Sequence, residues 1–365
     1  MTRYTDVRRI ATDHTTFSND LFDVTPAGMH DPADTEHQRF VEIASRVLMC
    51  ADPPVHTRIR STFRTAFTPD AVERWRGAVL DATTTLLGEF EPGREIDIMP
   101  RLAADVPVAV IASILGVPRD VWGNFRSWSF AYASTFDPMV QGERRDEAIR
   151  TSLVLFDFLA DLAEQRRAHP ADDLISTIVQ TRTDDGDLLS EAELIAQIAL
   201  LLVAGNDTTT NLIGNGITLL LDNPEVRAEI AADPALLPKT IEEMLRIDPP
   251  LHLTFRLLTK DAIVGEQHLT AGTLVAPCIA TANRDPRAFP DPGRFDIHRA
   301  ENNKHLAFLH GIHFCVGAAL ARLEGQVVFE ELLRHYPDFS AGSEPAVRRT
   351  RNAVARGWEK RPVRL

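Results

Sequence analysis

The sequence predicts a mainly α-helical chain with a small β-sheet region, which is an α+β fold. Most of the 365 residues lie in long stretches where apolar residues recur with helical spacing. Between residues 251 and 279 the pattern changes to short runs separated by turn residues, which is typical of strands. No linker-like segment divides the chain, so we expect residues 1–365 to form a single domain.

Capping and turn residues delimit the expected elements along the chain. Pro53–Pro54 precedes the first clear helix, and Ser190 with Glu193 forms a capping-box pattern before the longest one. Pro224 stops that long helix, and Pro249 ends the next. Helices are expected at residues 55–67, 71–90, 102–115, 152–168, 172–179, 190–221, 236–247 and from Cys315 to about 335; strands are expected at 251–258, 262–264 and 273–279; residues 283–299 are expected to be irregular.

Composition and charge restrict the classes of function. The net charge of -13 argues against general affinity for nucleic acid or for an anionic membrane. The most apolar stretch, residues 194–204, is too short to span a bilayer. Cys50, Cys278 and Cys315 are far apart, so we expect neither a disulfide framework nor a CxxC metal site. These features together predict a cytoplasmic protein whose partners include neither nucleic acid nor membrane.

One of the cysteines, Cys315, lies in a glycine-flanked segment directly before a helical run. Gly311 and Gly317 leave room for a flat ligand against the backbone. A sulfur at the start of a helix meets free N–H groups and the positive end of the dipole, and both favour the thiolate. A lone cysteine is more often a small buried hydrophobic residue. The combined pattern is specific, however, and consists of Phe308, Gly311, His313, Cys315 and Gly317.

A second pattern places polar residues in the middle of the longest predicted helix. Asp207 and Thr208 follow Gly205 in an otherwise apolar region, where polar side chains are costly unless they are satisfied or used. A threonine hydroxyl can bond the carbonyl one turn back and open the helix, and a neighbouring carboxylate can then relay protons. The alternative is a helix kink with a solvated face.

Two further pairs of residues have helical spacing. Glu243 and Arg246 are three residues apart and share a helix face, so that they can form an ion pair. His56 and Arg60 are four residues apart and could hold an anion together. Surface pairs with this spacing are common, so the spacing alone does not distinguish a site from a solvated helix face.

Taken together, these patterns resemble the cytochrome P-450 family, the haem-thiolate monooxygenases, in both order and spacing. The resemblance covers essentially the whole chain and implies the P-450 fold, with haem b between the long central helix and the cysteine-loop helix. It implies that the Cys315 thiolate binds the iron and that Asp207 and Thr208 deliver protons. The further haem contacts that it implies are His56, Arg60, Arg256, Phe308, Gly311, His313 and Gly317; the implied structural set is Glu243, Arg246 and Arg294.

The sequence departs from the family pattern at two places. Leu309 stands where the family usually has a small residue, often glycine, which would crowd the haem face next to the sulfur and alter its hydrogen bonding. The usual N-terminal helix and first strands are missing ahead of Tyr4, so we expect either that the start site is misplaced or that the sheet has an open edge.

The resemblance further implies that one oxygen atom from O2 is inserted into a small organic substrate, in bacterial secondary or xenobiotic metabolism. The chain has no Gly-x-Gly-x-x-Gly motif for a nicotinamide or flavin, so electrons are expected from a separate ferredoxin and ferredoxin reductase. Docking of an acidic ferredoxin is expected at Arg58, Arg60, Arg64 and Arg322. The alternatives are another haem-thiolate reaction (peroxygenase, coupling or dehydration), a non-catalytic haem-binding protein, or a helical structural protein.

The expected substrate pocket follows from position in the chain. His252 and Thr254 are its candidate polar contacts, although a solvated loop explains them equally well. The other segments expected to contribute are residues 21–50, 136–140 and 353–355. The candidate pocket residues are Leu200, Val203, Ala204, Leu251, His252 and Thr254.

Overall fold

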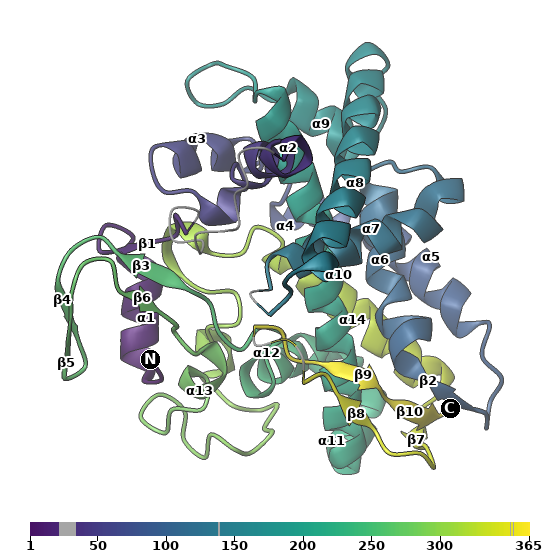
Figure 1. Cartoon of the computed structure of the whole chain (residues 1–365). Helices are drawn as coiled ribbons and strands as arrows, with labels where there is room; N and C mark the ends of the chain where they lie inside the picture. Colours follow the sequence, from purple (N-terminus) through teal and green to yellow (C-terminus); the bar gives the residue numbers. More distant parts are fainter. Residues whose placement is uncertain (22–33, 138, 351, 353) are drawn as a thin grey trace.

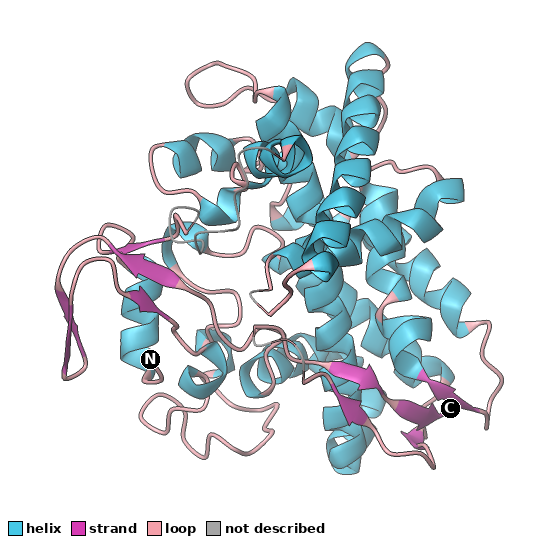
Figure 2. Cartoon of the chain, viewed as in Figure 1, coloured by secondary structure: helices cyan, strands magenta, loops and turns pink. Residues whose placement is uncertain are grey.

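The computed structural model describes residues 1–21, 34–137, 139–350, 352 and 354–365. Helices dominate these residues, and short strands form small groups at the periphery, which confirms the predicted fold class (Figures 1 and 2). The helices are α1 (Tyr4–Thr12), α2 (Thr35–Ala44), α3 (Val55–Ser61), α4 (Pro69–Glu73), α5 (Arg76–Leu87), α6 (Asp105–Ile114), α7 (Trp122–Thr135), α8 (Glu143–Ala168), α9 (Leu174–Gln180), α10 (Glu191–Asp222), α11 (Pro224–Ala232), α12 (Leu237–Ile247), α13 (Ile279–Ala282) and α14 (Ala318–His335).

The predicted helices are present, with changes at their ends. The helix expected over residues 55–67 ends at Ser61, and the one expected over 71–90 is divided into α4 and α5. Helix α8 begins nine residues before the predicted position 152, at Glu143. Helices α1, α2, α7 and α11 were not predicted, because their apolar spacing is weaker or their length is short.

Helix α10 is the central element of the fold. Its N-terminus has the predicted capping box, in which Ser190 Oγ accepts from the Glu193 N–H (3.3 Å) and Glu193 Oε2 accepts from the Ser190 N–H (2.9 Å). It packs against α6, α7, α8, α12 and α14. A Cβ at Gly216 would lie 2.4 Å from Phe329 Cζ, so this glycine allows the close approach of α10 to α14. The long central helix and the helix that follows the cysteine segment are thus packed directly together.

The strands are short and pair antiparallel. They are β1 (Phe17–Ser18), β3 (Arg256–Leu258) and β6 (Leu274–Val275) in the order β1-β3-β6; β2 (Glu95–Asp97), β10 (Pro362–Arg364) and β7 (Ser340–Ala341) in the order β2-β10-β7; the pair β4 (Ala262–Val264) and β5 (Gln267–Leu269); and the pair β8 (Val347–Arg348) and β9 (Trp358–Lys360). Of the predicted strands, 262–264 has the predicted bounds, whereas 251–258 and 273–279 are shorter.

The start of the chain supports the segment around Cys315. The Met1 amine donates to Ala276 O (3.1 Å) and Met1 O accepts from the Cys278 N–H (2.7 Å), so the first residue is bonded to the segment that follows β6. Helix α1 then packs on the cysteine loop. Gly311 has a φ of +73°, and a Cβ at this position would lie only 2.8 Å from Ala11 O. No larger residue therefore fits there without a shift of the backbone.

Candidate active site

A cavity of about 390 Å³ lies between α10 and the segment that carries Cys315. Its wall on α10 includes Leu200, Ala204 and Thr208. Phe308, His313, Cys315 and Gly317 line it from the cysteine segment, and Leu251, Thr254 and Arg256 line it from the chain leading into β3. Arg60 of α3 lines it too, so the structure brings together eleven of the residues predicted from sequence, which come from four separate parts of the chain.

The side chain of Cys315 is open to this cavity although protein surrounds it. Its N–H donates to Phe308 O (3.0 Å), and α14 begins three residues later at Ala318. Burial raises the pKa of the Cys315 thiol, while a hydrogen bond from the Gly317 N–H and the charges of Arg60 and Arg322 only partly oppose that rise. The N–H before α14 thus favours the thiolate, as the sequence predicted, although burial opposes it, and a bound metal cation would add to the stabilisation of the thiolate.

On α10, the structure separates Asp207 from Thr208. Thr208 lines the cavity, and its Oγ1 donates to Ala204 O (2.5 Å), the carbonyl one turn back, as the sequence predicted. Asp207 is not among the cavity-lining residues. Its Oδ1 pairs with Arg349 Nη1 (2.8 Å) and its Oδ2 accepts from Asn211 Nδ2 (3.4 Å). The acid is thus held away from the cavity by a residue of the C-terminal region.

At the rim of the cavity, two histidines and two arginines meet; we call His56, Arg60, Arg256 and His313 the rim cluster. The rings of His56 and His313 pack edge-on with centroids 4.4 Å apart. Arg60 Nη2 donates to Phe314 O (2.6 Å), and Arg256 Nη1 donates to Thr254 Oγ1 (3.0 Å). Both ring nitrogens of His56, His313 Nε2 and Arg256 Nη2 are buried without a hydrogen-bond partner among the described residues.

The crowding of these groups shifts their pKa values. Burial, followed by the Arg60 charge, lowers the pKa of His56 to about 4. Burial, followed by the neighbouring His56, lowers the pKa of His313 to about 3, and burial lowers that of Arg256 to about 10. Buried donors that lack a hydrogen-bond partner and have depressed pKa values are typical of an anion-binding site. The rim cluster therefore fits the carboxylates of a haem group beside a cavity that Cys315 enters.

Comparison with known proteins identifies the family. The family model described as Cytochrome P-450 matches residues 14–344. The chain belongs to the cytochrome P-450 family. Its cofactor is accordingly haem, and it is a monooxygenase, an oxidoreductase that acts on organic substrates with O2 and redox partner proteins. Among the described residues, no helix has the length and apolar character needed to cross a membrane.

Curated relatives and solved structures agree with this assignment. Cytochrome P-450 107B1 of Saccharopolyspora erythraea is 41% identical over 87% of this chain and 76% of its own length. The 6-deoxyerythronolide B hydroxylase of the same organism is 38% identical over 86% and 77% of the two chains. Vitamin D(3) 25-hydroxylase of Pseudonocardia autotrophica is 33% identical over 100% and 87%. The structure of P-450BioI with an acyl carrier protein superposes with a TM-score of 0.90 at 28% identity, covering 100% of this chain and 91% of that one.

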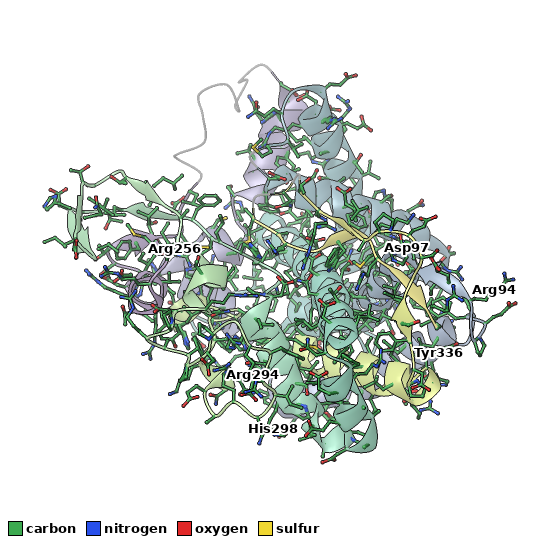
Figure 3. All side chains as sticks on the ribbon, turned by 90° about the horizontal axis from the view of Figure 1, so that it is seen from below. Arg94, Asp97, Arg256, Arg294, His298 and Tyr336 are labelled. Carbon is green, nitrogen blue, oxygen red and sulfur yellow. The ribbon has the colours of Figure 1, made fainter. Side chains whose placement is uncertain are left out.

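In this P-450, the predicted pair Glu243–Arg246 is fully buried and bidentate. Arg246 Nε and Nη2 donate to the two Glu243 carboxylate oxygens, each at 2.7 Å. The prediction of Arg294 as the third member is wrong. Arg294 contributes only its carbonyl (3.0 Å from Arg246 Nη2), and its side chain, labelled in Figure 3, is exposed. Arg299 takes that place, with Nε 3.3 Å from Glu243 Oε1. We call Glu243, Arg246 and Arg299 the loop cluster, because it fixes the irregular residues 283–299.

Two of the predicted pocket residues do not line the cavity. Val203 faces away from the cavity-lining positions on α10. His252 has Nε2 3.9 Å from Asp248 Oδ1, and its N–H donates to Val354 O (2.8 Å), so it belongs to the contact with the C-terminal region. Thr254 lines the cavity, but its hydroxyl already accepts from Arg256. Of the segments expected to contribute, residues 22–33, Pro138 and Ala353 lie outside the described residues.

Sequence reasoning missed several residues of the site. Arg349 is one, because its partner Asp207 is far away in the chain. Glu324 is another: it lines the cavity, is buried, and has an unpartnered Oε2, and burial raises the pKa of its carboxyl well above the usual range. The available signal was a glutamate on α14 with the spacing of an apolar position.

Proposed function

We propose that this P-450 hydroxylates a large, mainly apolar organic compound, with the Cys315 thiolate as the protein ligand of haem b. The observation that carries the proposal is the Cys315 side chain open to a cavity that is also walled by Ala204 and Thr208 of α10. When bound, haem supplies the binding and reductive activation of O2 and the transfer of one oxygen atom to a C–H bond. The chain orients the substrate, excludes water and moves protons.

Within this proposal, the rim cluster holds the haem carboxylates. His56, Arg60, Arg256 and His313 supply the donors, and the atoms without partners are the ones expected to turn to the carboxylates. Gly311 and Gly317 keep the backbone close to the ring, and the loop cluster fixes the segment that precedes the cysteine. These residues set the position of the cofactor rather than its chemistry.

Proton delivery is assigned to Asp207 and Thr208. Thr208 Oγ1 lies on the cavity wall, where it can hold a proton close to the reacting atoms. Asp207 is bound by Arg349 and Asn211, so its carboxylate must leave Arg349 before it can pass a proton toward Thr208. We expect proton supply to be coupled to this exchange.

The substrate class follows from the cavity wall, which is largely apolar, together with the relatives. Two relatives are named as hydroxylases of 6-deoxyerythronolide B and of vitamin D3. We propose a substrate of comparable kind, a bulky alicyclic compound with few polar groups, in bacterial secondary or xenobiotic metabolism. A cytoplasmic location belongs to the same proposal, since all three cysteines are free.

A ferredoxin, reduced by a ferredoxin reductase, is the proposed electron donor. The structure changes the expected docking residues: Arg322 is bound to Glu242 and Arg58 to Glu193, so neither charge is free. A hollow of about 450 Å³ next to Cys315 is lined by Arg60, Arg64 and Phe314. Arg64 is also paired, with Asp184 (2.9 Å), but its side chain is 67% exposed, so of the four expected arginines it is the one that an acidic partner reaches most readily.

The first experiment is the carbon monoxide difference spectrum of the reduced protein. The parent should show the strongly red-shifted Soret band of thiolate ligation, and Cys315→Ser should abolish it. Cys278→Ser is the matched control and should keep the band, because Cys278 does not line the cavity. A red-shifted band that persists in Cys315→Ser would contradict the ligand assignment.

The reaction type is tested separately from the ligand. A panel of macrolide and steroid compounds is screened for the spin-state shift that accompanies displacement of water from the haem. Compounds that shift the spectrum are then incubated either with O2 and a ferredoxin system or with hydrogen peroxide alone. Product formation that needs O2 and the electron donor supports the monooxygenase reaction, whereas turnover with peroxide alone supports a peroxygenase.

A further inference from the structure

Behind the cysteine loop, three polar side chains pack against Phe308. They are Glu242 on α12, His305 in the loop, and Arg322 on α14, and with Phe308 we call them the Phe308 cluster. Phe308 is buried, and its carbonyl accepts from the N–H of Cys315 (3.0 Å). The cluster is therefore attached to the residue that carries the sulfur, from the protein side.

Arg322 is held in one orientation by two kinds of contact. Its Cζ lies 4.5 Å from the centroid of the Phe308 ring, which is a cation–π geometry. Its Nε and Nη2 donate to Glu242 Oε1 and Oε2 at 2.6 and 2.9 Å. A bidentate pair of this kind fixes both the distance and the plane of the guanidinium. The charge of Arg322 consequently stays on the face of Phe308.

His305 completes the cluster from the other side of Glu242. It is 4% exposed, and its ring centroid lies 5.8 Å from that of Phe308. Its Nδ1 accepts from the Ala307 N–H (3.1 Å), which places the ring proton on Nε2, 3.3 Å from Glu242 Oε2. Burial raises the pKa of Glu242, but hydrogen bonds from Arg322 and His305 more than offset this and lower it to about 2. Glu242 is thus a carboxylate at any pH at which the enzyme works.

The charges of this cluster act on the sulfur with opposite signs. Arg322 lies on the ring of Phe308, whose carbonyl is bonded to the N–H of Cys315, so its positive charge stabilises negative charge on the nearby sulfur. Glu242 is bonded to Arg322 and carries the opposite charge, so it opposes that effect. Both residues are largely shielded from water, with side-chain exposures of 32% for Arg322 and 14% for Glu242, so solvent screens the interaction only in part.

We propose that Glu242 and Arg322 tune the reduction potential of the haem iron through the negative charge at Cys315, with Phe308 as the contact between the pair and the cysteine loop. The proposal rests on the ligand assignment above. One-electron reduction adds a negative charge to the site, so a nearby cation favours the reduced form and a nearby anion disfavours it. Arg322 therefore raises the potential, and Glu242 limits that rise. Both are positioning residues in our interpretation, since neither lines the surface at which substrate binds.

The two charges can be removed separately with nearly isosteric changes. Glu242→Gln leaves the Arg322 charge unopposed, so the midpoint potential should shift to more positive values. Arg322→Gln leaves Glu242 unopposed, so the potential should shift to more negative values. The double variant should lie between the two. Potentials are measured on the haem-loaded protein by equilibrium titration with dithionite and mediators, without a ferredoxin, so that docking does not contribute.

A matched control is available on the same helix. Arg334 pairs with Glu331 near the end of α14, sixteen residues and about 24 Å further along the helix than Ala318. Arg334→Gln removes an equal charge and should leave the potential unchanged. Haem content and the carbon monoxide spectrum of each variant establish that the site is intact before the potentials are compared.

Opposite shifts support the proposal, because a purely structural role would move both single variants in the same direction or release haem from both. Shifts of the same sign, or no shift in either variant, overturn it. If Arg322→Gln does not retain haem, Glu242→Gln decides alone: a positive shift supports the proposal, and a negative or absent shift overturns it. Failure of the ligand assignment itself is seen separately, as a parent protein without the red-shifted carbon monoxide band.

Discussion

The loop cluster and the rim cluster are both groups of ionisable side chains beside the cysteine segment, yet they differ in how many of their polar atoms have partners. In the loop cluster, Arg246 donates to both oxygens of Glu243 and to the carbonyls of Asn283 (2.9 Å) and Pro292 (2.9 Å). In the rim cluster, His56 has no hydrogen bond at either ring nitrogen among the described residues, and Arg256 Nη2 has none.

This difference distinguishes the loop cluster, which stabilises the fold, from the rim cluster, which is proposed to bind a ligand. A buried charge without a partner costs several kcal/mol in folding free energy. A protein therefore retains such a group only where a bound ligand supplies the partner or where function requires the group. The complete cluster needs no ligand and fixes the backbone between α13 and the cysteine loop. The incomplete one would become satisfied if carboxylates entered, which is the role proposed for it above.

The largest expected effect comes from breaking the complete cluster. Arg246→Ala leaves Glu243 charged and buried, with both side chains 0% exposed in the parent, so we expect a loss of about 3–5 kcal/mol in the free energy of unfolding. Chemical denaturation and haem content measure it. Arg294→Ala is the control and should change stability by less than about 0.5 kcal/mol, because only the backbone of Arg294 takes part. Equal losses in the two variants would contradict the assignment of Arg299 as the third member.

The loop cluster shows which contacts the sequence predicts and which it does not. Glu243 and Arg246 lie on one helix, so their contact follows from the helical repeat. Arg294 and Arg299 lie five residues apart in an irregular segment, where no period indicates which side chain turns inward. Phe289 of that segment is buried beneath Arg246, and which arginine turns inward depends on the whole path of the chain.

Long-range contacts were missed for a related reason. Thr208 was predicted correctly to bond the carbonyl of Ala204, since that contact is local to one helical turn. The partner of Asp207 was not predicted, because Arg349 comes from the C-terminal region and reaches α10 only through tertiary packing. His252 was predicted from its position in the chain to line the cavity, but its N–H donates to Val354 O and its ring lies near Asp248, so contacts with the C-terminal region decide where it lies.

The incomplete cluster can be tested by pH. Unfolded histidines take up protons below pH about 6.5, whereas folded His56 resists protonation until about 4. The unfolded state therefore binds more protons between these values, and the free energy of unfolding of the haem-free chain falls as pH is lowered through this window. His56→Gln removes this term and should make the fall shallower by up to about 1.4 kcal/mol per pH unit. Urea denaturation from pH 7.5 to 5 measures it; parallel curves for parent and variant would show that His56 is already paired.

In the sequence, Leu309 lies between Arg299 of the loop cluster and His313 of the rim cluster. Substitution of Leu309 gives the smallest expected effect. Its φ of +57° is in the left-handed region, where an L side chain is strained by about 1–2 kcal/mol, yet its side chain packs beside Val7, Ile279 and Leu306. Leu309→Ala loses the packing and keeps the strain, whereas Leu309→Gly loses both. We therefore expect the glycine variant to be more stable than the alanine variant by about 1 kcal/mol in chemical denaturation. At Leu306, which has an ordinary φ, the order should reverse because glycine adds only flexibility; the same order at both positions would mean that Leu309 carries no backbone strain.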